Sequence, residues 1–132
     1  MKVLIVDDND QGLYLLRTVL EHAGHEVWPT GDGAEALALA GKQVPDAIIT
    51  DILMPRLDGL QALARLRGDA ATADIPVIFV SARGDDAVKA RTLDLGAADY
   101  LQKPFSDREL RARLERTLRL SQSQTALREL AL

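Results

Sequence analysis

The chain has 132 residues, 47% of them apolar, and a formal net charge of −4 at pH 7. This length fits one domain with a core that needs no disulfide or metal support. The absence of cysteine excludes disulfide frameworks and thiol chemistry, and two histidines are too few for a multi-histidine metal centre. The acidic balance argues against direct nucleic-acid binding. Without a membrane-spanning apolar run or a basic leader, we expect a cytoplasmic protein.

Short apolar runs alternate with amphipathic stretches five times. In chain order, the predicted elements are a strand at 2–6, a helix at 13–23, a strand at 25–28, a helix at 33–40, a strand at 47–50, a helix at 59–67, a strand at 76–80, a helix at 85–95, a strand at 99–101 and a helix at 107–120. Asn9 or Asp10 is expected to cap the first helix. Gly24, Pro29 and Gly41 are expected to end the elements that precede them.

This alternation predicts an α/β fold in which a five-stranded parallel sheet carries five helices on both faces. In open sheets of this kind, chemistry lies beyond the carboxyl ends of the strands. The residues at those ends are Asp7, Asp8, Asp51, Ser81 and Lys103.

Three carboxylates that converge on one edge repel each other unless a cation neutralises them. Oxygen ligands without histidine or cysteine favour a hard ion, so we expect Mg²⁺, with Mn²⁺ as a substitute. A bound Mg²⁺ and a lysine ammonium would stabilise a transferring phosphoryl group, and a carboxylate there can become an aspartyl phosphate.

These residues lie in segments that resemble the receiver domains of bacterial two-component response regulators, a flavodoxin-like family. The resemblance covers residues 1 to about 120. It is carried by the acidic pair in 6–9, the phosphoacceptor segment with its Met-Pro and later glycine in 51–59, the switch hydroxyl in 81–83, and the switch aromatic with its Lys-Pro-Phe turn in 96–105.

The resemblance implies that Asp51 accepts a phosphoryl group from a phosphohistidine. It also implies that Asp8, Asp51 and the backbone carbonyl of Leu53 bind Mg²⁺ directly, while Asp7 acts through a metal-bound water.

For the phosphorylated state, the resemblance implies that Lys103 pairs with the phosphoryl group and that Ser81 moves to hydrogen-bond it. Tyr100 would swing inward behind Ser81, and Pro104 would follow a cis peptide bond.

Two residues depart from common members of the family or vary within it. Leu53 and Arg83 would form a rim beside the phosphoryl group. An apolar Leu53 would not orient an attacking water, and Arg83 would shield the acyl phosphate or attract the anion. We therefore expect slow self-dephosphorylation.

A cognate histidine kinase or phosphotransfer protein is the partner that the resemblance implies. Kinase choice is expected on the first helix and the loop after the fifth strand, around Gln11, Gly12, Tyr14, Leu15 and Thr18. The signalling surface would be the face of the fourth helix, fifth strand and fifth helix. There Arg91, Asp99 and Arg113 resemble a charge network through which one subfamily forms two-fold dimers.

The receiver domain is predicted at 1–120, with a C-terminal helical extension or linker at 121–132. We expect an output domain to follow in a longer protein.

Two other functions stay open. The spacing of Asp8 and Asp10 fits a small phosphohydrolase in which Asp8 is the nucleophile and Asp10 the acid and base. A phosphorylation-independent pseudo-receiver that only binds partners is the other alternative. The chain has no glycine-rich nucleotide-binding motif.

Overall fold

A computed structural model describes residues 1–52, 59–82 and 86–131. The described residues form one parallel sheet with strand order β2-β1-β3-β4-β5, which confirms the predicted fold. The strands are β1 (Lys2–Val6), β2 (Glu26–Thr30), β3 (Ala47–Asp51), β4 (Val77–Ser81) and β5 (Asp99–Gln102). The helices are α1 (Asp10–His22), α2 (Gly33–Gln43), α3 (Gly59–Gly68), α4 (Asp86–Asp94) and α5 (Asp107–Ala131).

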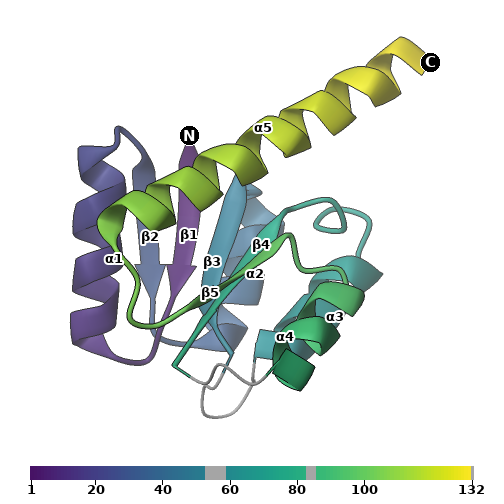
Figure 1. Ribbon diagram of the computed structural model, residues 1–132. Coiled ribbons are helices and arrows are strands. Elements are labelled where there is room, and N and C mark those ends of the chain that lie inside the picture. Colours follow the sequence, from purple (N-terminus) through teal and green to yellow (C-terminus); the bar gives the residue numbers. More distant parts are fainter. Residues whose placement is uncertain (53–58, 83–85, 132) are drawn as a thin grey trace.

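The sheet separates two hydrophobic clusters, one under each helical layer (Figure 1). Leu16 and Leu20 of α1 join Leu110 and Leu114 of α5 on one face. Ala36 of α2 joins residues of α3 and the aromatic rings of β4 and β5 on the other face. Because both faces are covered, the central strands are apolar without alternation, as the unbroken run at 3–6 indicated.

The residues predicted to end β2 and α2 do not end them. Pro29 does not close β2 but lies inside it, opposite Ile5; β2 is an edge strand, where a missing N–H is tolerated. Gly41 does not end α2, which continues to Gln43. Val44 instead takes the left-handed cap position (φ 36°), and its N–H donates to the Ala40 carbonyl.

Of the two alternatives left open for residues 121–132, a helical extension and a linker, the structure has the helical extension. Helix α5 continues through the polar tract at 121–124 as one helix to Ala131 and reaches past the sheet (Figure 1). Leu110, Leu114 and Leu118 pack on the core, whereas Leu127 and Leu130 are exposed. No helix among the described residues is both long and apolar enough to cross a membrane.

The start of α3 is pressed against the end of β3 with no room for a side chain. A Cβ at Gly59 would lie 2.7 Å from Cε1 of Phe79 and 2.8 Å from the backbone oxygen of Asp51. The Gly59 N–H also donates to the Ile52 carbonyl at 2.8 Å. Glycine at this position therefore lets the strand that carries Asp51 pack closely on α3.

We predict that Gly59→Ala lowers the free energy of unfolding by about 1–3 kcal/mol, because the added methyl group overpacks a rigid site. Urea denaturation measures this change. Gly68→Ala is the matched control, since a Cβ at the last residue of α3 meets nothing within 4 Å. Equal stability of the two variants would contradict the prediction.

Candidate functional site

The carboxyl edge of the sheet brings together acidic residues from two neighbouring strands. Residue pairs in β1 and β3 are in parallel register, with Val6 opposite Thr50. Asp7, which follows Val6, therefore comes beside Asp51, the last residue of β3. Asp8 completes the group, and oxygen atoms of Asp7, Asp8 and Asp51 lie within 4.8 Å of one another.

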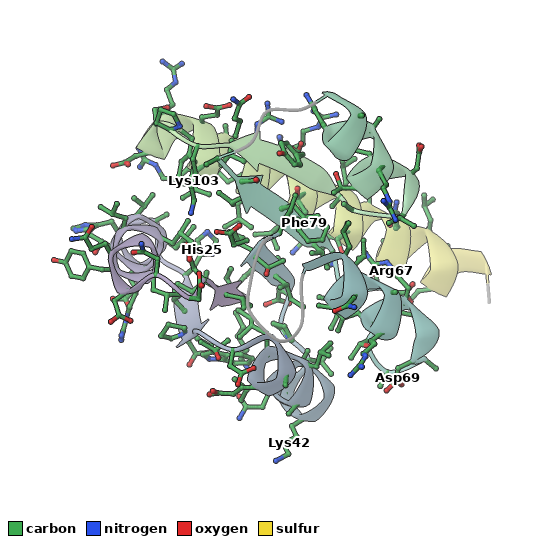
Figure 2. All side chains as sticks on the ribbon, turned by 90° about the horizontal axis from the view of Figure 1, so that it is seen from below. His25, Lys42, Arg67, Asp69, Phe79 and Lys103 are labelled. Carbon is green, nitrogen blue, oxygen red and sulfur yellow. The ribbon has the colours of Figure 1, made fainter. Side chains whose placement is uncertain are left out.

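Lys103 reaches these carboxylates from the connection between β5 and α5. Its Nζ lies 3.2 Å from Oδ2 of Asp7 and 3.5 Å from Oδ2 of Asp51. Figure 2 views the molecule from below, and Lys103 lies there between α1 and the strands. The predicted convergence of Asp7, Asp8, Asp51 and Lys103 is thus observed.

Burial disfavours the charged form of Lys103, but its acidic neighbours favour that form more strongly. Desolvation alone would lower the pKa of the ammonium. Hydrogen bonds and charges from Asp7 and Asp51 more than offset this, so the pKa lies above its ordinary value. Lys103 therefore remains cationic throughout the neutral pH range.

The cap of α1 is joined to the acidic cluster. Asn9 caps the helix, and its side-chain oxygen accepts hydrogen bonds from the N–H groups of Gln11 and Gly12. The Asn9 N–H donates to Oδ1 of Asp7 at 3.0 Å. Asp7 is almost fully buried, at 2% exposure, and each of its oxygens accepts a hydrogen bond from the protein. Asp8, in contrast, is exposed.

Ser81 and Tyr100 occupy the neighbouring strands on the other side of Asp51. Ser81 is the last residue of β4 and is buried, and its carbonyl accepts the Lys103 N–H at 2.8 Å. Tyr100 is 3% exposed and already packed in the core on the α2–α3 face. The Lys103–Pro104 peptide bond is cis. The rim residues Leu53 and Arg83 lie outside the described residues.

The donor set fits a hard divalent cation. It offers three carboxylate oxygens close enough to share one ion, and the cluster contains no nitrogen or sulfur ligand. Because both Asp7 oxygens already accept hydrogen bonds, Asp7 has less capacity for a direct metal bond than Asp8. Asp51, with 18% side-chain exposure, remains reachable from solvent.

Two of the three residues predicted to form the dimer interface pair with each other within one chain. Arg113 Nη1 of α5 donates to Oδ1 of Asp99 in β5 at 2.8 Å. This hydrogen bond outweighs burial and raises the pKa of the Arg113 guanidinium. Arg91 of α4 is exposed. An internal pair thus orders two of the three charges on this face.

Sequence reasoning missed Arg67, at the end of α3. Its guanidinium donates to the carbonyls of Ala73, Ile75 and Gly96, which ties α3 to the start of β4 and to the turn before β5. Figure 2 shows Arg67 well apart from Lys103. These three acceptors are backbone oxygens, so no side-chain motif marks them. Arg67 holds the turn from which β5 begins.

Comparison with known proteins gives one consistent result. A family model described as the response regulator receiver domain matches residues 3–115. Response regulator MprA of Mycobacterium tuberculosis is 38% identical over 132 residues, 100% of this chain and 56% of MprA. The alkaline phosphatase synthesis transcriptional regulatory protein PhoP of Bacillus subtilis is 39% identical over 121 residues, 92% of this chain and 50% of PhoP.

A solved structure adds a bound metal to this comparison. The receiver domain of sensor histidine kinase PA1611 from Pseudomonas aeruginosa has a magnesium ion coordinated in its active site cleft. It superposes with a TM-score of 0.82 and 32% identity over 89% of this chain and 96% of that one. The chain spans about half the length of the curated relatives it matches.

Proposed function

Because the chain belongs to the response regulator receiver domains, a family of phosphorylation-dependent signalling domains, we propose that Asp51 is its phosphoacceptor. The observation that carries the proposal is the cluster at the carboxyl edge of the sheet. There Asp51 lies beside two further carboxylates and 3.5 Å from the Lys103 ammonium. The Asp51 carboxylate, as the nucleophile, therefore lies next to carboxylates that can hold a cation and next to the positive charge of Lys103.

Receiver domains bind Mg²⁺ at an acidic pocket of this kind. In this chain, Asp8, Asp51 and the backbone carbonyl of Leu53 would hold the ion, with Asp7 acting through water. The ion would supply neutralisation of charge on the phosphoryl oxygens. The hydrogen bonds on both oxygens of Asp7 support its indirect role.

In the transfer step, an Asp51 carboxylate oxygen forms a bond to phosphorus as the N–P bond of the donor phosphohistidine breaks. The electron pair of that bond leaves with the imidazole nitrogen, which takes up a proton. The product carries about two negative charges and three acceptor oxygens. Lys103 then pairs with this group, and the Ser81 hydroxyl donates to it.

The two other functions lack the support of a specific contact. Asp10, the proposed acid of a phosphohydrolase, is exposed in the first turn of α1, whereas Asp51 and Lys103 join the cluster. A pseudo-receiver that only binds partners would not need the complete set of strand-end residues, which are Asp7, Asp8, Asp51, Ser81 and Lys103. We infer a signalling domain whose only chemistry is its own phosphotransfer and self-dephosphorylation.

We predict that incubation with Mg²⁺ and acetyl phosphate adds one phosphoryl group, because Asp51 is the one nucleophile of the proposed site. Intact-mass spectrometry measures the adduct. Asp51→Asn should abolish it, and omission of Mg²⁺ should prevent it.

Asp94→Asn, at an exposed position in α4, is the matched control and should be phosphorylated like the wild type. Continuous release of phosphate without an adduct would contradict the proposal and favour turnover by a phosphohydrolase. An adduct that persists in Asp51→Asn would place the modification elsewhere.

We further predict that the acyl phosphate lasts for minutes or longer. The apolar Leu53 side chain cannot orient a water molecule for attack on phosphorus, and the Arg83 cation would screen the group. Loss of phosphoryl label from purified protein measures the half-life. Leu53→Asn should shorten it, because an amide can hydrogen-bond the attacking water. A half-life of seconds in the wild type would contradict the prediction.

A histidine kinase or phosphotransfer protein is the proposed phosphodonor partner. Tyr14 and Leu15 of α1 are 69% and 63% exposed and lie one to two turns from the acidic cluster. Their exposure supports the expected contact surface at the start of α1. For the whole protein, we propose an output domain after residue 132, with residues 121–132 as the connecting segment.

The output surface is proposed to be the face of α4, β5 and α5, through which phosphorylated copies would dimerise. Phosphorylation should therefore raise the dimer fraction in sedimentation velocity. Arg91→Glu should weaken the dimer at least about tenfold. The substitution would put a second negative charge beside Asp99 in the charge network of the proposed dimer.

Arg65→Glu, an exposed change of the same charge on α3, is the control and should leave the dimer intact. A dimer fraction that is the same before and after phosphorylation would contradict this prediction.

A further inference from the structure

The first turn of α1 leaves a gap that the Asp7 carboxylate fills. A Cβ at Gly12 would overlap Oδ2 of Asp7 and lie 3.1 Å from its Cγ. The third nearest atom is Oδ1 of the same residue, at 3.7 Å. Outside adjacent residues and the helix backbone, no other atom is closer. A side chain at position 12 would therefore collide with the Asp7 carboxylate alone.

Neither partner of this contact is free to move away. The Gly12 N–H donates to the capping oxygen of Asn9 at 3.1 Å, which fixes the turn. The Asn9 N–H in turn holds Oδ1 of Asp7, and Lys103 holds Oδ2. Gly12, Asn9 and Asp7 thus each contact the other two, and Lys103 holds Asp7 from the other side.

Glycine is a poor choice for this position on helix grounds. Gly12 is the third residue of α1 and lies within the helix, beyond its Asn9 cap. Glycine inside a helix makes that helix less stable than alanine does. The close approach of Asp7 gives a reason for the exception.

We propose that Gly12 is a positioning residue, whose missing side chain lets the Asp7 carboxylate lie where it pairs with Lys103 and faces the cation site. This inference rests on the magnesium site of the proposed function. Groups around a metal's direct ligands commonly change its affinity 10- to 100-fold when altered. A side chain at position 12 would displace such a group.

The test measures Mg²⁺ affinity by calorimetry and the urea midpoint of the metal-free protein. Gly12→Ala should weaken Mg²⁺ binding about tenfold and lower the midpoint. Gly41→Ala is the matched control, because it lies inside α2 with nothing within 4 Å of its Cβ. It should leave Mg²⁺ affinity unchanged and raise the midpoint.

An Asp7→Ala background separates positioning from a general packing defect. Without the carboxylate, Gly12→Ala should raise the urea midpoint and change Mg²⁺ affinity less than twofold. If Gly12→Ala alone does not fold, Asp7→Ala should restore folding.

Three results would overturn the proposal: a change in affinity below threefold, tighter binding in Gly12→Ala, or the same loss of stability in both backgrounds. A wild type that binds no Mg²⁺ would refute the proposed metal site instead. The sign of the change in urea midpoint would still decide whether Gly12 positions Asp7.

Discussion

Mutual repulsion of three carboxylates at one edge of the sheet is the constraint on which the site depends. Two unit charges about 4 Å apart near a protein surface interact with about 4 kcal/mol. Asp7, Asp8 and Asp51 form three repulsive pairs. Lys103 makes close attractive contacts with two of these three carboxylates, those of Asp7 and Asp51. The lysine therefore offsets part of the repulsion. The remaining negative charge is what makes the edge receptive to a divalent cation.

Much of this edge could be predicted from the sequence because it depends on local patterns. Apolar runs locate the strands, and a parallel sheet gathers the residues at their carboxyl ends. Asp7, Asp51 and Lys103 follow from these two rules. Pro29 could not be placed in the same way. Whether a proline ends a strand or lies within it depends on the strand's place in the sheet, and β2 proves to be an edge.

Other features depend on how the elements pack against one another or on tracts whose pattern fits two structures. The backbone carbonyls that accept from Arg67 belong to two segments, the connection before β4 and the turn before β5, and carry no sequence signal. The closeness of Gly12 to Asp7 depends on how α1 lies against β1, which no local pattern specifies. The length of α5 was left open because a Ser-Gln tract is equally compatible with a linker and with a solvated helix.

Strand β5 and the residue after it join the site to the proposed output face. Asp99 binds Arg113 of α5, Tyr100 packs into the core on the α2–α3 face, and Leu101 packs into the core beneath α1 and α5. Lys103, after the strand, pairs with Asp7 and Asp51. Arg67 holds the turn before the strand through Gly96. A change in charge at Asp51 would therefore act on Lys103, at one end of a strand whose other end carries Asp99 of the proposed dimer face. Because Tyr100 is already buried, transmission through β5 does not require this ring to travel from solvent into the core.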